Sequence, residues 1–134
     1  MSGFSRRLAS AALCLLLASS PTYAARPEPD AVISFPAGSD DLSAVDLATL
    51  QHLAAKASAD PANWINVEAY SDDPGSREMN LALAQRRIED ISHRLAICGF
   101  PANRIRGINF ADKRVEEDDL PLGRVEIRIL KFGL

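Results

Sequence analysis

The stretch WINVEAYSDDPGSREMNLALAQRRIEDISHRLAICGFP, residues 64–101, decides the fold of this chain. Apolar and polar side chains alternate over residues 64–70, and the apolar face consists of Ile65, Val67 and Ala69. Because side chains of a strand point alternately to opposite faces, this pattern predicts a half-buried β-strand with a polar outer face.

A long helix is expected after that strand. The loop at residues 71–75 ends the alternation, and Ser76 is a suitable N-cap. Gly99 and Pro101 predict the end of the helix, because glycine is favoured just after a helix and proline cannot continue one. The residues expected to face the core recur at helical spacing, and they are Ala84, Ile88, Ile91 and Leu95.

Two elements are expected before this stretch. The compact apolar residues 31–35 predict a first strand. Ser43 with Asp46 approximates a capping box, and apolar residues at helical spacing follow, so a helix is expected to extend to about Ser58.

Two further strands are expected towards the C-terminus, at residues 104–110, where Gly107 interrupts the pattern, and at residues 124–130. The order is then strand, helix, strand, helix, strand, strand, or βαβαββ. This alternation predicts an α/β fold, an α+β sandwich in which two helices pack on one face of a mixed four-stranded sheet.

The first residues have the order of a secretory signal peptide. Arg6 and Arg7 form a positive region, an apolar run covers residues 8–19, and small residues lead to a cleavage site after Ala24. The apolar run is too short to span a bilayer, so an uncleaved anchor helix is the less favoured alternative, and no transmembrane segment is expected in the mature chain. The expected organisation is a signal peptide at 1–24, a short tether at 25–31 and one domain at 32–134.

The two cysteines raise separate questions. Cys14 suggests the alternative of a lipoprotein cleaved before a lipidated cysteine, but Leu13 stands where such processing requires a small residue, so lipidation is the minor alternative. Cys98 is the only cysteine expected in the mature chain, so it forms no internal disulfide, and it is expected to be a buried small hydrophobe.

Composition excludes several classes of partner. Of 15 Lys and Arg residues, Arg6 and Arg7 leave with the signal peptide, so 13 basic residues face 18 acidic ones and the net charge is −5. This disfavours nucleic acid and anionic lipid. His52 and His93 lie far apart, so neither a metal nor another cofactor is expected. No nucleophile–base pair or carboxylate dyad is evident, and an enzyme is the least favoured class.

A candidate binding site follows the strand at residues 64–70. Asp72 lies in the loop after it, and Asn80 and Arg87 lie on one side of the next helix, roughly 10 Å apart along its axis. A carboxylate and a guanidinium that face one cleft suit a zwitterionic ligand, because one takes the ammonium group and the other the carboxylate. The alternatives are that Asp72 pairs with Arg87, or that Arg87 is a solvated helix residue.

The chain resembles the OmpA-like, peptidoglycan-binding domain family. The resemblance covers nearly all of the expected mature chain, in order and at matching spacings. It is carried by residues 67–76, by Asn80, Leu83, Arg86, Arg87 and Leu95, by the first strand and its exit at residues 33–39, by the link at residues 99–105, and by the last strand at residues 124–127.

In that family the loop aspartate and the second arginine of the helix motif hold the diaminopimelate residue of the peptidoglycan stem peptide. The resemblance therefore implies a peptidoglycan site made of Asp72 and Arg87, with Asn80 in support and Arg124 contributed by the last-strand motif. It implies a non-catalytic module without a cofactor, free in the periplasm or docked on an outer-membrane partner.

The sequence departs from the family pattern at several positions. Leu122 and Gly123 stand where Asn and Arg precede the last arginine, and Ile88 stands where a small alanine is usual, so the helix is expected to lie slightly further from the sheet. The alternative function is an envelope protein–protein interaction module that keeps the scaffold without peptidoglycan binding. The altered last-strand motif favours it, although the acidic run at residues 116–119 is expected to be a solvated loop.

Overall fold

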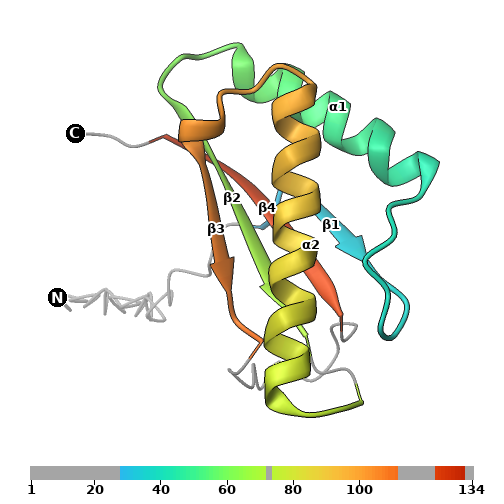
Figure 1. The fold of residues 1–134 in the computed structure, drawn as a ribbon. Helices are drawn as coiled ribbons and strands as arrows, with labels where there is room; N and C mark the ends of the chain where they lie inside the picture. Colours follow the sequence, from blue (N-terminus) through green and yellow to red (C-terminus); the bar gives the residue numbers. More distant parts are fainter. Residues whose placement is uncertain (1–27, 72–73, 112–122, 132–134) are drawn as a thin grey trace, which may run out of the picture.

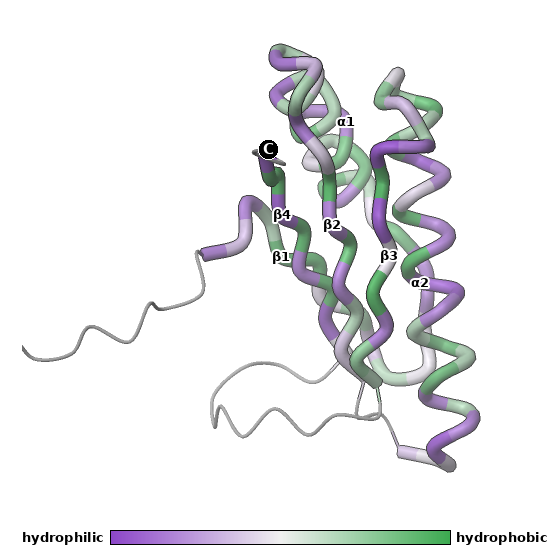
Figure 2. Tube along the Cα trace, turned by 90° about the vertical axis from the view of Figure 1, so that its left-hand side faces the viewer, coloured by the Kyte–Doolittle hydropathy of each residue, from purple (hydrophilic) through white to green (hydrophobic). Residues whose placement is uncertain are grey.

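The computed structural model describes residues 28–71, 74–111 and 123–131. Two helices lie on one side of a four-stranded sheet, as Figure 1 shows from the helix side and Figure 2 along the sheet. The elements in chain order are β1 (Ala31–Ser34), α1 (Ala44–Ser58), β2 (Asn63–Tyr70), α2 (Arg77–Ile97), a short 3₁₀ turn (Ala102–Arg104), β3 (Ile105–Asn109) and β4 (Arg124–Lys131). The predicted α/β fold class and the packing of both helices on one face are confirmed.

Both predicted helix caps are present. At the start of α1, the Ser43 hydroxyl accepts from the backbone N–H of Asp46, and the Asp46 carboxylate accepts from the N–H of Ser43, which completes a capping box. Ser76 caps α2 by accepting from the N–H of Met79. Helix α2 then extends to Ile97, and Gly99 follows with a φ of 99°, a conformation that glycine adopts without steric cost.

The sheet has the strand order β1-β4-β2-β3. Strand β4 runs antiparallel to both β1 and β2, whereas β2 and β3 run parallel, so the sheet is mixed as predicted. Arg124 pairs with Ser34 on one side and with Tyr70 on the other. The exits of β1 and β2 and the start of β4 therefore lie together at one end of the sheet, the lower end in Figure 1.

The ordered sheet reaches back into the segment predicted as a tether. β1 begins at Ala31, and the Asp30 N–H already donates to the Ile127 carbonyl at 2.9 Å. The Asp30 carboxylate also accepts from the N–H of Ile129 at 2.7 Å. The predicted signal peptide at residues 1–24 and the acidic run at 116–119 lie outside the described residues. In the described part of the chain, neither helix is long and apolar enough to cross a bilayer.

The prediction of a half-buried β2 was wrong. Asn66 and Glu68, expected on a solvated face, are 6% and 4% exposed. An ion-pair chain on the sheet face opposite the helices offsets the cost of burying Glu68. Arg128 on the adjacent strand contacts both Glu68 and Glu126, the latter at 3.0 Å, and Glu126 also pairs with Arg124 at 3.4 Å. These charges satisfy one another, so they remain buried although they alternate with core residues.

The expectation that Ile88 holds α2 further from the sheet missed a compensating residue. A Cβ at Gly107 in β3 would lie 2.5 Å from Cγ2 of Ile88, which is closer than real Cβ contacts allow. The absence of a side chain at Gly107 therefore accommodates the branched side chain on α2. The glycine that weakened the strand pattern is the position where helix and sheet approach most tightly.

This contact predicts a measurable coupling. Gly107→Ala should lower the free energy of unfolding by about 1–3 kcal/mol, since overpacking forces the helix or the strand to shift. The double variant with both Gly107→Ala and Ile88→Ala should lose less free energy of unfolding than the two single variants lose in sum. Urea denaturation of the four proteins measures the coupling, and strict additivity would contradict the close approach.

Candidate functional site

Arg87 is the most deeply buried charged residue of the candidate site. It is 0% exposed, so the alternative of a solvated helix residue was wrong. Its Nε donates to the Ser39 carbonyl at 2.8 Å and its Nη2 to the Pro36 carbonyl at 3.3 Å. The guanidinium carbon also lies 4.8 Å from the centroid of the Phe35 ring. Arg87 therefore ties α2 to the segment that leaves β1.

Asn80 lies two helical turns before Arg87 and is 8% exposed. The Ser71 hydroxyl donates to its side-chain oxygen at 3.4 Å. Ser71 directly follows β2 and precedes Asp72, which lies outside the described residues. The structure thus brings the end of β2 next to the polar residue that the sequence predicted to support the site.

Arg124 lies on the opposite side of the sheet from Asn80 and Arg87. Its neighbours along β4, Val125 and Ile127, belong to the core under the helices, so its own side chain points the other way. There its guanidinium carbon lies 4.4 Å from the centroid of Tyr70 and its Nε lies 3.4 Å from the Glu126 carboxylate. The structure does not bring this predicted site residue together with Asn80 and Arg87.

Three charged groups lie beside Arg87, and they are Asp40 in the loop after β1 and Arg86 and Asp90 on α2. Arg86 lies 3.7 Å from the Asp40 carboxylate, and Asp90 also interacts with Asp40. Partial burial and the hydrogen bond and charge of Asp40 raise the pKa of Asp90 above its ordinary value of 3.8. The loop after β1 is therefore attached to α2 by backbone carbonyls at Arg87 and by Asp40 at Arg86, whereas Asp90 places a like charge beside Asp40.

The described residues contain no group of three or more His, Cys, Asp and Glu side chains placed to hold a metal ion. The chemistry available in this region is hydrogen bonding and charge recognition by a guanidinium, an amide and a hydroxyl. Sequence reasoning missed Pro36 and Ser39, whose carbonyls hold Arg87. Only the resemblance of residues 33–39 to the family's first strand drew attention to that segment, because a backbone acceptor has no signature of its own in a sequence.

The fold has close counterparts among solved structures. The peptidoglycan-associated lipoprotein of Burkholderia pseudomallei superposes with a TM-score of 0.65 at 22% identity, covering 74% of this chain and 89% of that one. The C-terminal domain of Helicobacter pylori MotB has a TM-score of 0.65 at 20% identity, covering 75% and 84%. The OmpA-like domain of FopA1 from Francisella tularensis has a TM-score of 0.61 at 13% identity, covering 76% and 74%. This chain has the fold of an OmpA-like domain.

Curated relatives agree with that assignment. The peptidoglycan-associated lipoprotein of Brucella melitensis is 43% identical over 54 residues, which are 40% of this chain and 32% of the relative. That of Agrobacterium fabrum is 37% identical over 82 residues, 61% of this chain and 46% of the relative. The chain thus spans less than half the length of these relatives. No protein-family model matches it.

The contacts of Arg87 predict that it stabilises the fold. Arg87→Gln should lower the free energy of unfolding by about 3 kcal/mol, because it leaves two buried carbonyls without their charge-assisted donor. The neighbouring Arg86→Gln is a matched control, since the Arg86 side chain is 55% exposed. Its effect should stay within about 0.5 kcal/mol. Equal effects of the two changes in chemical denaturation would contradict the structural role of Arg87.

The raised pKa of Asp90 predicts a pH dependence of stability. The folded state holds the Asp90 proton more tightly than the unfolded state, so this group makes the protein less stable as pH rises from about 3.8 through the raised pKa. Asp90→Asn removes the ionised form and should raise Tm at pH 7. The difference should shrink at about pH 2.5, well below the ordinary value of 3.8, where Asp90 is protonated in both states. An unchanged difference across thermal scans at both pH values would contradict this cause.

Proposed function

We propose that this protein is a non-catalytic peptidoglycan-binding module of the bacterial envelope. In this proposal Asp72 receives the ammonium group of the diaminopimelate residue in the stem peptide and Arg87 receives its carboxylate, with Asn80 in support. The protein acts in the periplasm, free or associated with the outer membrane. The observation that carries the proposal is the position of Asn80 and Arg87 on the buried side of α2, where Asn80 accepts a hydrogen bond from Ser71, the residue before Asp72.

The names of the relatives agree with this assignment. Proteins named peptidoglycan-associated lipoprotein share up to 43% identity with segments of the chain, and a solved structure of one shares its fold. The chemistry is also suitable. Each charge-assisted contact contributes on the order of 1.5–3 kcal/mol, which gives a weak site for one stem peptide. A polymer that offers many copies of the ligand compensates for that weakness.

Burial adds a conformational step to the proposed binding. Because Arg87 is 0% exposed, a ligand carboxylate reaches its guanidinium only after the surrounding chain opens. The bonds to the Pro36 and Ser39 carbonyls meanwhile hold the guanidinium in a fixed orientation. Part of the binding free energy is then used to open the site, which lowers the apparent affinity without changing the contacts made in the complex.

A second candidate function is an envelope protein–protein interaction module on the same scaffold. The contacts of Arg87 favour it, because backbone carbonyls already engage two nitrogens of its guanidinium. The placement of Arg124 on the opposite sheet face also favours it, because the last-strand motif then contributes nothing to the proposed peptidoglycan site.

Co-sedimentation with purified diaminopimelate-containing sacculi distinguishes the two candidates. We expect the wild-type chain to bind saturably, and Asp72→Ala to reduce binding by about tenfold, the loss of one charge-assisted contact. Asp73→Ala is the matched control, because it removes the adjacent loop carboxylate and should leave binding unchanged. Free diaminopimelate should compete with the sacculi.

Three outcomes would decide against the proposal. If the folded wild type stays in the supernatant, the scaffold has another partner. Equal losses of binding in Asp72→Ala and Asp73→Ala would show that the general negative charge of the loop accounts for binding, and not a specific site. Arg87→Gln tests the second contact only if circular dichroism shows that the variant is folded at the temperature of the assay, since Arg87 also stabilises the domain.

A further inference from the structure

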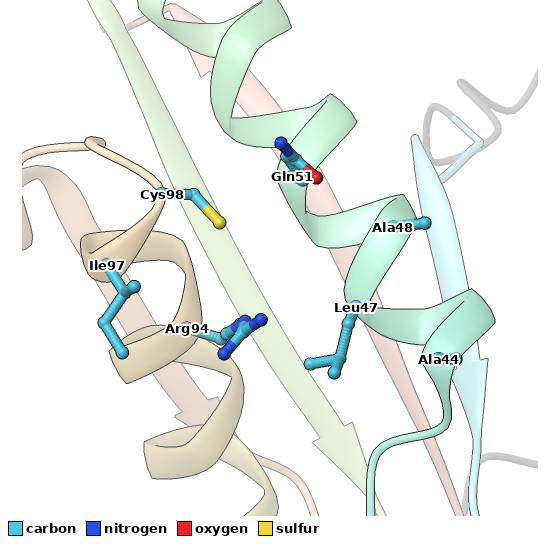
Figure 3. A pocket seen from close by; sticks show the side chains of 7 residues that line it. All are labelled: Ala44, Leu47, Ala48, Gln51, Arg94, Ile97 and Cys98. Carbon is cyan, nitrogen blue, oxygen red and sulfur yellow. The ribbon is translucent and has the colours of Figure 1, made fainter.

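A groove lies between the two helices, at the end of α2 far from Asn80. Its α1 wall includes Leu47, Ala48 and Gln51, and its α2 wall consists of Arg94, Ile97 and Cys98 (Figure 3). Its volume is about 460 Å³. Arg94 lies seven residues, roughly 10 Å along the helix, beyond Arg87 of the candidate peptidoglycan site, and fourteen residues, roughly 20 Å, beyond Asn80.

The groove is lined by apolar and polar side chains, and α1 carries two apolar stripes. One, made of Leu50, Leu53, Ala54 and Ala57, is buried in the core. The other, roughly 100° round the helix, includes Leu47 and Ala48, which line the groove. Ile97 on the opposite wall is 60% exposed, although a large aliphatic side chain gains stability when it is covered. The groove therefore offers apolar surface that the described chain leaves uncovered.

Arg94 is the only charged side chain among the residues that line the groove. Its Nε is buried without a hydrogen-bond partner, and within the described ranges it forms no ion pair. Figure 3 shows the guanidinium extending from α2 into the space between the helices, towards Leu47. An incoming carboxylate would gain a charge-assisted contact with the guanidinium.

The first turn of α1 adds to the preference for an anion. Ala44, the first residue of α1, also lines the groove, and the N-terminus of a helix carries a partial positive charge. The acid of that turn, Asp46, is engaged with the backbone of Ser43 at 2.9 Å. A ligand that combines a carboxylate with apolar groups thus matches both the charge and the surface of the groove.

We propose that this groove is a docking site for a segment of a partner protein that presents one Glu or Asp side chain between apolar residues. The carboxylate pairs with Arg94, and its apolar neighbours cover Leu47 and Ile97. A phosphate-rich polymer would need several cations, whereas the groove supplies one. Amphipathic helices that place apolar anchors in a groove are a common means of peptide recognition. This site is separate from the peptidoglycan site and does not depend on it.

A pair of synthetic peptides tests the proposal directly. The first is a short amphipathic helical peptide, blocked at both ends, with a single glutamate flanked by leucines, and the second has glutamine in place of that glutamate. Amide NMR spectra of the full chain, recorded during titration with each peptide, report both the site and the affinity. We expect shifts at Leu47, Ala48 and Ile97, and about tenfold tighter binding of the glutamate peptide.

Variants assign the preference to Arg94. Arg94→Gln should bind both peptides equally, at the weaker affinity of the glutamine peptide. Arg77→Gln is the matched control, because it removes the same charge from the first turn of α2 and should keep the tenfold preference. The spectra also show whether each variant is folded.

The proposal is overturned if neither peptide shifts the groove residues at about 1 mM, an affinity too weak for a docking site. It is also overturned if the two peptides bind the wild type equally, or if the shifts map to another face. Concentration-dependent shifts of the same residues without peptide would assign the groove to a second copy of this chain and would equally contradict a partner segment.

Discussion

Arg87 joins helix α2 to the segment that leaves β1, and much of the candidate site depends on that attachment. Its Nε and Nη2 donate to the carbonyls of Ser39 and Pro36, and the guanidinium lies against the Phe35 ring. A fully buried cation requires partners of this kind, since an unpaired one would be too costly to bury. The same side chain that the family resemblance assigns to ligand binding therefore also holds the fold together, and the two roles compete for its donors.

The two faces of the sheet are stabilised by different interactions. The face under the helices is apolar. Ile88 packs there against Gly107, where a side chain on the strand would not fit. The opposite face buries charges that satisfy one another along β4 and β2, from Glu68 through Arg128 and Glu126 to Arg124. Arg124 belongs to this second face, and a motif that looks contiguous with the site in a family pattern is separated from it by the thickness of the sheet.

Helix α2 connects two regions with different chemistry. Its N-terminal half, with Asn80 and Arg87, is polar and follows the end of β2, and it is the region to which we assign the cell-wall ligand. Its C-terminal turns, with Arg94 and Ile97, form a groove with α1 (Figure 3). Arg94 lies about two turns of helix beyond Arg87 and about four beyond Asn80, so the two regions occupy successive stretches of the same helix.

The sequence by itself determined the elements, because they depend on local rules. Capping at Ser43 and Ser76, the stripe from Ala84 to Leu95 and the alternation of the strands each act within a few residues, so the helices and the mixed four-stranded fold were predictable. Within the candidate site, the polarity and spacing of Asn80 and Arg87 were predictable in the same way.

Only the tertiary structure decided which faces are buried and which residues meet. The burial of Glu68 depends on its pairing with Arg128, sixty residues away, and the closeness of α2 to β3 depends on a glycine facing Ile88. The carbonyls that hold Arg87 come from residues 36–39, some fifty positions earlier. Contacts of this kind have no local pattern, because strand register and helix packing create them, and backbone acceptors are present at every residue.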